Sequence, residues 1–162
     1  KYLVKNLIYP LPDPNLPFLG VHFTKLINGD IEAGPNAVLA LAREGYDWKI
    51  VNLHEFWESL TYPGLWKFIA KYPTITAGEI LRSLIKPVFV ESLKKLIPDI
   101  RSEMLVKGNA GIRAQLMNSN GTLEDDFCIK KSGNIISILN APSPAATSSI
   151  AIADYLIESL GL

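Results

Sequence analysis

The stretch that decides the fold is Ile135-Ile136-Ser137-Ile138-Leu139-Asn140-Ala141-Pro142-Ser143-Pro144-Ala145-Ala146-Thr147-Ser148-Ser149. Its β-branched start favours a buried strand, and Pro142 and Pro144 end that strand because each lacks a backbone donor. A helix should begin just after Pro144, with Ser143 as its N-cap, and run to Leu160. The free N–H groups of such a helix start suit a phosphate, a carboxylate or the electron-rich edge of a ring. On spacing alone, the alternative is an ordinary capped helix packed through alanine and serine.

Length and composition limit the class of protein. The chain has 162 residues, 48% of them hydrophobic, which is enough for one domain with a sizeable core or one domain plus part of another. Lys and Arg together number 16, as do Asp and Glu, and no basic stripe is present, so we expect no nucleic-acid partner. A single cysteine, Cys128, excludes an internal disulfide framework. No apolar run approaches the roughly 20 residues that span a bilayer, so we expect a soluble chain.

The beginning of the chain predicts a strand, a loop and a hairpin. Residues 3–9 read as a strand, and four prolines in the next eight residues require an extended loop. Residues 18–27 alternate as a strand, Asn28-Gly29-Asp30 forms a tight turn, and residues 31–34 pair back antiparallel. A short helix is expected over 37–43. Because the chain opens on Lys1 within a strand pattern, we expect a piece of a longer protein, cut by proteolysis or cloning.

A helical insert of about residues 48–107 follows. Three segments carry apolar residues at helical spacing: 53–60, 65–71 and 77–97. Asn52 and Thr76 are the expected N-caps of these helices. Pro63 and Pro73 are the expected breaks between them. Pro87 lies inside the longest segment and predicts either a kink or two helices that meet at Lys86. A short helical turn should follow Pro98, and the tryptophans of this region are expected to anchor the core.

Strands return after Gly108. They are expected over 111–117, 123–130 and 135–139, with turns at Ser119-Asn120-Gly121 and Ser132-Gly133-Asn134. The order of elements predicts an α+β fold, in which a helical layer covers an antiparallel sheet.

Four sequence blocks precede the stretch quoted first: Asn6-Leu7-Ile8-Tyr9-Pro10-Leu11-Pro12-Asp13, Phe18-Leu19-Gly20-Val21-His22-Phe23-Thr24, Gly34-Pro35-Asn36-Ala37-Val38 and Ala110-Gly111-Ile112-Arg113-Ala114-Gln115. Together with residues 140–149, and in this order, they closely resemble the C-terminal part of L-2-hydroxyglutarate oxidases or dehydrogenases. The resemblance runs over nearly the whole chain and is weakest over residues 48–107. This family lies in the flavoprotein superfamily that includes D-amino-acid oxidase and glycine oxidase.

The resemblance implies an FAD-dependent oxidoreductase that oxidises L-2-hydroxyglutarate to 2-oxoglutarate by hydride transfer to flavin. Residues 1–133 would form the substrate domain of a D-amino-acid-oxidase-like flavoprotein, and 134–162 the last strand and helix of its FAD domain. The glycine-rich turn that holds the FAD pyrophosphate in this family is absent, so the N-terminal FAD domain is missing. We therefore expect the isolated chain to be inactive and not to retain FAD. Oxygen or a membrane quinone would accept the electrons.

Oxidation of a 2-hydroxy acid needs a cation or donors for its carboxylate, and Arg113 is our first choice. Its planar fork suits bidentate binding, and it stands among small and apolar residues where a charge needs a partner. The alternative is a structural ion pair with Asp125 or Asp126. The residues alone leave the two readings balanced, and the resemblance favours the substrate.

The reaction also needs a base, and His22 is the better of the two histidines because it shares a strand face with Thr24. The alternative for His22 is a satisfied core imidazole, whereas His54 is expected at the surface or in a cap. We assign the catalytic roles to His22 and Arg113. Substrate binding would involve Tyr9, Thr24 and Asn36 as well as Arg113, with packing as the alternative for Tyr9 and Asn36.

The resemblance places the opening stretch against the flavin ring. The expected cofactor-binding residues are Asn140, Ala141, Pro142, Ser143, Pro144, Ala145 and Thr147. We expect no metal. Two alternatives stay open: a sister flavoprotein for another small hydroxy or amino acid, and a non-catalytic binding module that self-associates through an exposed surface. The bacterial cytoplasm, the periphery of the inner membrane and the mitochondrion all fit this reading.

Overall fold

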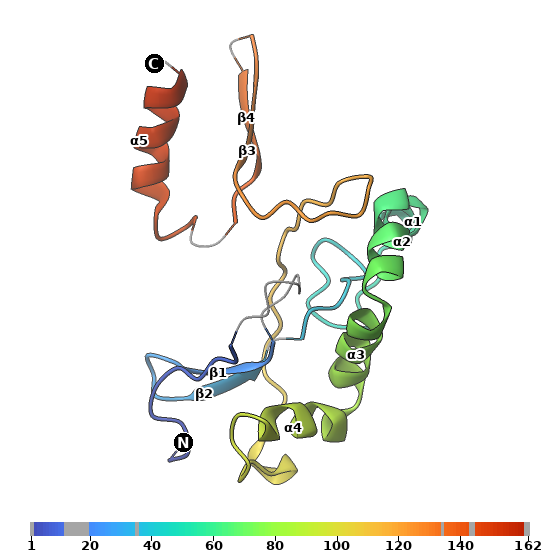
Figure 1. The fold of residues 1–162 in the computed structure, drawn as a ribbon, viewed down its shortest axis with the longest axis vertical. Helices are drawn as coiled ribbons and strands as arrows, with labels where there is room; N and C mark the ends of the chain where they lie inside the picture. Colours follow the sequence, from blue (N-terminus) through green and yellow to red (C-terminus); the bar gives the residue numbers. More distant parts are fainter. Residues whose placement is uncertain (1, 12–19, 35, 134, 143–144, 161–162) are drawn as a thin grey trace.

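The computed structural model describes residues 2–11, 20–34, 36–133, 135–142 and 145–160 (Figure 1). Its strands are β1 (His22–Lys25), β2 (Ile31–Gly34), β3 (Cys128–Ser132) and β4 (Ile135–Asn140). Its helices are α1 (Leu53–Thr61), α2 (Pro63–Lys71), α3 (Pro73–Leu84), α4 (Lys86–Lys94) and α5 (Ser149–Leu160), with a 3-10 turn at Ser102–Met104. The mixture of helices and antiparallel strands agrees with the predicted fold class.

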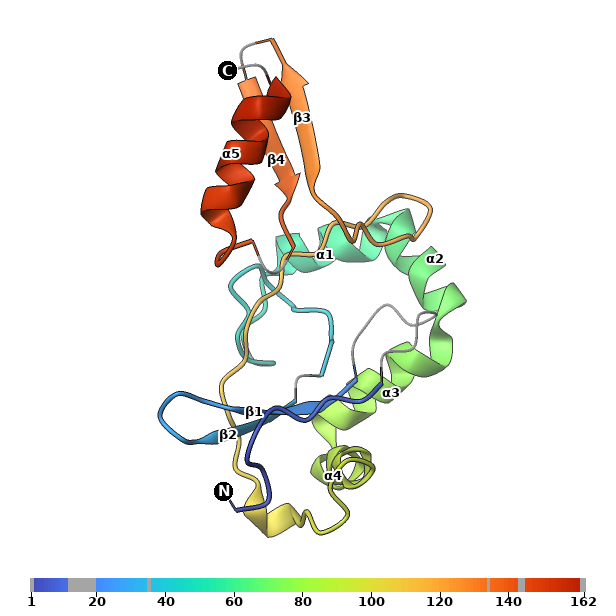
Figure 2. The ribbon, with the colours of Figure 1, turned by 60° about the vertical axis from the view of Figure 1, so that its left-hand side comes forward.

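The strands of the described residues form two separate sheets instead of the single sheet that was expected. The antiparallel pair β1–β2 is one of them, and the antiparallel pair β3–β4 is the other. Figures 1 and 2 show helices α1 to α4 following one another along one side of the molecule, with β1–β2 beside the α3 and α4 end. The β3–β4 hairpin and α5 lie together at the opposite end.

The main core lies between β1–β2 and α4. Phe23 of β1 and Leu93 of α4 are its two most buried side chains, and four other buried residues complete it: Val4, Val90, Ile97 and Ile100. The burial of Phe23 turns its strand neighbours His22 and Thr24 to the opposite face, as the alternation predicts. The expectation for the tryptophans is wrong, because Trp48, Trp57 and Trp66 are all exposed.

The helix boundaries agree with the predictions where a capping side chain or a proline sets them. Asn52 caps α1, since its side chain accepts hydrogen bonds from the N–H groups of His54 and Glu55 at 3.1 and 3.3 Å. Two helices, α3 and α4, replace the long predicted segment and meet at Lys86, with Pro87 in the first turn of α4. Thr76 is not a cap. Helix α3 already begins at Pro73, because a proline in the first turn loses no hydrogen bond.

Three further predictions are wrong. Residues 3–9 and 111–117 form no strands, and each contributes a single antiparallel bridge, Ile8 to Phe23 and Met117 to Leu123. Residues 37–43 form bends and turns instead of a helix. The expected turns are present, with positive φ angles of 80°, 85° and 58° at Gly29, Gly121 and Gly133, which glycine adopts without a side-chain clash.

Candidate functional site

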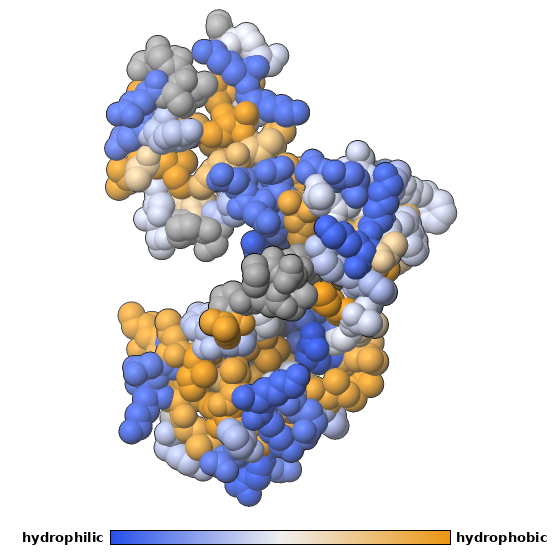
Figure 3. Space-filling model, viewed as in Figure 1, coloured by the Kyte–Doolittle hydropathy of each residue, from blue (hydrophilic) through white to orange (hydrophobic). Residues whose placement is uncertain are grey.

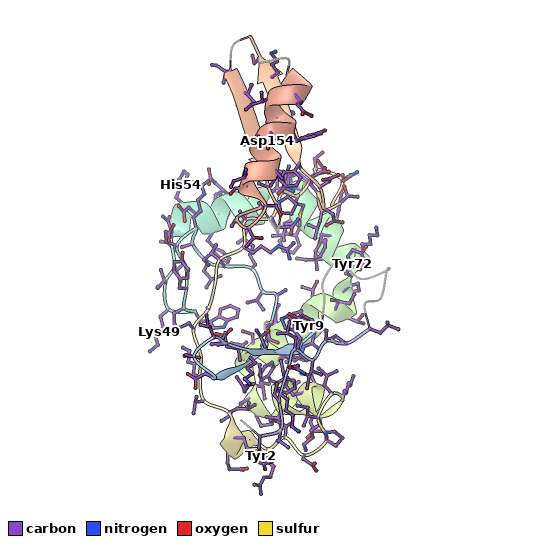
Figure 4. The ribbon with its side chains drawn as sticks, turned by 90° about the vertical axis from the view of Figure 1, so that its left-hand side faces the viewer. Tyr2, Tyr9, Lys49, His54, Tyr72 and Asp154 are labelled. Carbon is purple, nitrogen blue, oxygen red and sulfur yellow. The ribbon has the colours of Figure 1, made fainter. Side chains whose placement is uncertain are left out.

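Tyr9 and His22 come together at the edge of β1–β2. Two backbone hydrogen bonds of 3.0 and 2.9 Å join Ile8 to Phe23, and this bridge sets the next pair, Tyr9 and His22, side by side. Their rings stack with centroids 4.4 Å apart and planes 23° from parallel. Figure 4 shows Tyr9 beside this sheet. The stack limits the orientations open to the imidazole.

A hydrogen bond fixes the tautomer of His22 that suits a base. The Nδ1 atom lies 3.2 Å from the carbonyl oxygen of Gly20, and because a carbonyl only accepts, Nδ1 carries the proton. In the neutral ring, Nε2 then keeps its lone pair and can take a proton from a hydroxyl group. Half-buried His22 thus has the geometry of a general base. His54, in contrast, is exposed on α1 and lies 3.8 Å from Glu58, as expected of a surface histidine (Figure 4).

Asn36 lies two residues beyond the end of β2 and carries an unpaired buried acceptor. The register pairs His22 with Gly34, so the chain leaves the sheet at the His22 end and reaches Asn36 soon after. The Oδ1 atom of Asn36 is buried and has no hydrogen-bond partner among the described residues. The next N–H group, of Ala37, donates to the buried carboxylate of Glu79 on α3 at 2.9 Å. An orphaned buried acceptor on an anchored segment suits a donor from a bound molecule.

Arg113 lies in an irregular segment and is exposed. Within the described part of the chain no hydrogen bond or ion pair involves its guanidinium, so the alternative pairing with Asp125 or Asp126 is not present. The structure therefore brings Tyr9 and His22 into contact but leaves Arg113 without a contact to either. Its charge remains available to an anionic ligand.

The loop after β4 differs from its prediction. Residues 145–148 form turns, and α5 begins at Ser149 instead of just after Pro144. Serine and threonine compete for backbone hydrogen bonds and so delay a helix start. Ser143 and Pro144, and with them the predicted N-cap, lie outside the described residues. Of the other expected cofactor contacts, Ala141 and Thr147 are exposed, and Pro142 and Ala145 are half-buried.

Asn140 is buried, and its amide is committed within the chain. Its Nδ2 atom donates to the carbonyl oxygens of Glu124 and Asp126 at 3.0 and 2.8 Å. Gln115 also donates to the Glu124 carbonyl, at 3.0 Å. Sequence reasoning missed Gln115 and Glu124, because the sequence carries no signal for a hydrogen bond between a side chain and a distant backbone carbonyl.

Electrostatic perturbations lie away from these residues. The ammonium of Lys107 approaches Asp47 to 2.6 Å and holds the pKa of that carboxyl below its ordinary value of 3.8. A hydrogen bond with Glu44 raises the pKa of Tyr46. Among the residues that the structure describes, no three His, Cys, Asp or Glu side chains gather where a metal ion could bind. None of the described helices is both long and apolar enough to traverse a bilayer.

Two cavities lie apart from the candidate residues. One of about 140 Å³ is lined by apolar side chains under the core face of β1–β2, among them Phe23, Ile31 and Leu105. The other, of about 310 Å³, is an open hollow between α4 and the 3-10 turn. Neither is lined by Tyr9, His22 or Arg113.

Comparison with known proteins identifies similar chains. The protein is 55% identical over 158 residues to the L-2-hydroxyglutarate dehydrogenase of Indibacter alkaliphilus, covering 98% of this chain and 40% of that one. It is 47% identical to the mitochondrial L-2-hydroxyglutarate dehydrogenase of Caenorhabditis elegans, covering 96% of this chain and 37% of that one. It is 39% identical to the L-2-hydroxyglutarate dehydrogenase of Escherichia coli K12, covering 98% of this chain and 37% of that one. The predicted resemblance is confirmed, and the chain spans about two fifths of the length of these relatives. No protein-family model matches it.

Proposed function

We propose that this chain, which is homologous to the L-2-hydroxyglutarate dehydrogenases over nearly its whole length, is part of an enzyme that oxidises L-2-hydroxyglutarate to 2-oxoglutarate. The observation that carries the proposal is the 55% identity over 98% of the chain with a protein of that name. The hydrogen bond from Nδ1 of His22 to the carbonyl of Gly20, which leaves Nε2 as the acceptor atom of the ring, is compatible with the base that this oxidation needs.

In this proposal, the residues of the chain bind and deprotonate the substrate. Arg113 holds one carboxylate through two charge-assisted hydrogen bonds. Nε2 of His22 takes the hydroxyl proton while the carbon-bound hydrogen leaves with its electron pair. Thr24 shares the strand face of His22, and Tyr9 restrains the imidazole. The hydroxyl of Tyr9 and the amide N–H group of Asn36 would bind the second carboxylate, while the buried Oδ1 of Asn36 would accept a hydrogen bond from a donor on the bound molecule. FAD, when bound, would accept the hydride.

The names of the relatives imply a redox cofactor, and we propose FAD at the loop after β4. The residues proposed to contact it are Asn140, the last residue of β4, and six residues of the loop: Ala141, Pro142, Ser143, Pro144, Ala145 and Thr147. The exposed side chains of Ala141 and Thr147 leave room for a ring at this loop. Residues 1–133 would act as the substrate domain and 134–162 as the last part of the FAD domain. Oxygen or a quinone would reoxidise the cofactor.

The large accessible surface area of this chain supports the proposal that another domain of the full-length protein covers part of it. The chain exposes 11794 Å², whereas a compact monomer of 17.9 kDa exposes about 8,000 Å². The difference exceeds the roughly 800 Å² that one partner contributes to a standard interface. As for location, the Caenorhabditis relative is named mitochondrial, and we propose a mitochondrial or bacterial cytoplasmic site, either free or at the inner-membrane periphery.

The test uses the full-length protein that contains this chain, purified with its cofactor and mixed anaerobically with substrate. Prompt loss of oxidised-flavin absorbance with the L acid, and none with the D acid, is the expected result. Arg113→Met should raise KM about 10- to 100-fold, because a charge-assisted hydrogen bond contributes about 1.5–3 kcal/mol. Arg101→Met is the control, since Arg101 is an equally exposed arginine near α4.

Two outcomes contradict the proposal in different ways. A flavin-loaded protein that the L acid does not bleach would point to a sister enzyme for another small hydroxy or amino acid. A full-length protein that binds no flavin would favour a binding module without redox chemistry. Equal changes in KM for Arg113→Met and Arg101→Met would show that Arg113 does not bind the substrate.

A further inference from the structure

The peptide group of Glu124 joins two segments that are far apart in the sequence. Its carbonyl oxygen accepts one hydrogen bond from Nε2 of Gln115 and one from Nδ2 of Asn140, each 3.0 Å long. A carbonyl has two lone pairs, so both bonds are allowed at once. The N–H of Glu124 donates to the carbonyl of Leu116 at 2.9 Å, so both backbone polar groups of Glu124 are hydrogen-bonded.

Asn140 is suited to this contact in a way that most residues are not. Only 7% of its surface is exposed, and its second amide hydrogen goes to the carbonyl of Asp126 at 2.8 Å. A buried amide that serves two backbone acceptors is costly to replace, since its loss removes the donor to the Asp126 carbonyl and leaves the Glu124 carbonyl with Gln115 alone. Aspartate has the same shape but no hydrogen to donate, so it cannot substitute.

The segment that holds Glu124 is itself fixed to a helix. The hydroxyl of Tyr62, at the start of α2, donates to the carbonyl of Met117 at 2.8 Å, and Lys67 of α2 reaches the carbonyl of Ser119 at 3.1 Å. Figure 2 shows this loop beside the α1 and α2 end of the molecule, with β3 and β4 rising from it. The contact at Glu124 thus has a rigid support.

We propose that Asn140 and Gln115 are positioning residues that hold the proposed cofactor loop and the proposed carboxylate-binding arginine in a fixed relation. Asn140 is the last residue of β4 and leads directly into the loop after it, and Gln115 stands two residues after Arg113. The Glu124 carbonyl, which both amides share, is the link between them. This proposal rests on the proposed function. It assigns to the Asn140 amide a role inside the chain, so any contact of Asn140 with the cofactor comes from its other atoms.

The experiment compares Asn140→Ala and Gln115→Ala with Asn118→Ala in the full-length protein. Asn118 is the matched control, because its amide donates to Thr122 in the same loop but is exposed. Loss of the link should raise KM for L-2-hydroxyglutarate about tenfold in Asn140→Ala, and in Gln115→Ala, whose side chain has no proposed binding role, kcat and flavin content should change less than twofold. Gln115→Ala, which removes one partly buried bond, should act in the same direction and keeps the test valid if Asn140→Ala fails to fold.

Hydrogen exchange gives a readout that needs no substrate. Asn140→Ala should speed exchange in peptides that cover residues 111–117, and Gln115→Ala in peptides that cover residues 138–147, while Asn118→Ala should do neither. Unchanged KM in both variants, or exchange that rises only next to the substituted residue, overturns the proposal. If the wild-type protein does not oxidise the L acid, the proposed function fails, and the exchange data alone then decide whether the link exists.

Discussion

At the scale of single residues, Glu79 shows how one buried carboxylate fixes a loop. It lies on α3, is 8% exposed, pairs with Arg82 one turn later and accepts the N–H of Ala37. The loop that carries Asn36 is thereby attached to a helix more than 40 residues away in the sequence. A surface pair at the same spacing, Glu91 with Lys94 on α4, makes no such attachment.

Substitution of these two glutamates should therefore change the free energy of unfolding by different amounts. Glu79→Ala should lower the free energy of unfolding by about 1–3 kcal/mol, because it leaves the Ala37 N–H and a largely buried guanidinium without their acceptor. Glu91→Ala should cost less than about 1 kcal/mol, as exposed ion pairs do. Denaturant titration of the full-length protein and both variants measures the difference. Equal losses would show that the attachment at Ala37 adds nothing to stability.

For single residues, the sequence predicts which side chain suits a chemical role better than it predicts which side chains that residue contacts. The residue type of His22 and its strand face were enough to choose it over His54, and the structure agrees on that face. The stack with Tyr9 was not predictable, because it depends on the register between Ile8 and Phe23. Register across two unconnected segments is set by packing, which a single sequence does not reveal.

At the scale of elements, a glycine lets the 118–122 turn lie against α2. A Cβ atom at Gly121 would lie 2.7 Å from the backbone nitrogen of Phe68 and 2.9 Å from Cβ of Lys67. Gly121 also has a φ of +85°, close to the +80° of Gly29 in the β1–β2 turn, where a Cβ would meet nothing within 4 Å. The two glycines share a conformation and differ in their neighbours.

Alanine substitutions separate these two effects. Gly29→Ala should cost about 1–2 kcal/mol, the penalty for a left-handed residue with a side chain. Gly121→Ala should cost at least about 1 kcal/mol more, because the neighbouring atoms are mostly helix backbone that cannot retreat. Unfolding free energies of the full-length variants provide the test, and equal costs would mean that the turn can move off α2 freely.

Helices were predicted more accurately than strands for a physical reason. The cap at Asn52 and the first-turn prolines of α2, α3 and α4 act within one helical turn, so the local sequence contains the information. A strand needs a partner, and residues 3–9 and 111–117 find only one bridge each. The turns at Gly29 and Gly133 joined paired strands, although β3 spans Cys128–Ser132 instead of the predicted 123–130, and the turn at Gly121 joined only a single bridge.

At the scale of the whole molecule, many large apolar side chains of the described residues are exposed. The exposed large hydrophobic residues far outnumber the buried ones, and Figure 3 shows apolar side chains at the surface of both ends of the molecule. At the β3–β4 and α5 end, Ile135, Ile138, Ile150 and Tyr155 are all exposed. Exposed apolar residues gathered at one end of a molecule are typical of a region that another body covers, and we call these four residues the apolar face of this end.

The surface predicts that the isolated chain self-associates, whereas the full-length protein does not do so through this face. Light scattering after size exclusion should give masses above 17.9 kDa that rise with concentration, and an apolar dye should fluoresce with the isolated chain only. Replacing Ile138 and Ile150 by lysine should lower the apparent mass. Ile27→Lys is the control, because Ile27 is exposed at the β1–β2 turn, far from that face (Figure 1). A concentration-independent monomer that binds no dye would show that the chain covers its own apolar surface in solution, and the argument for a covering domain would lose its structural support.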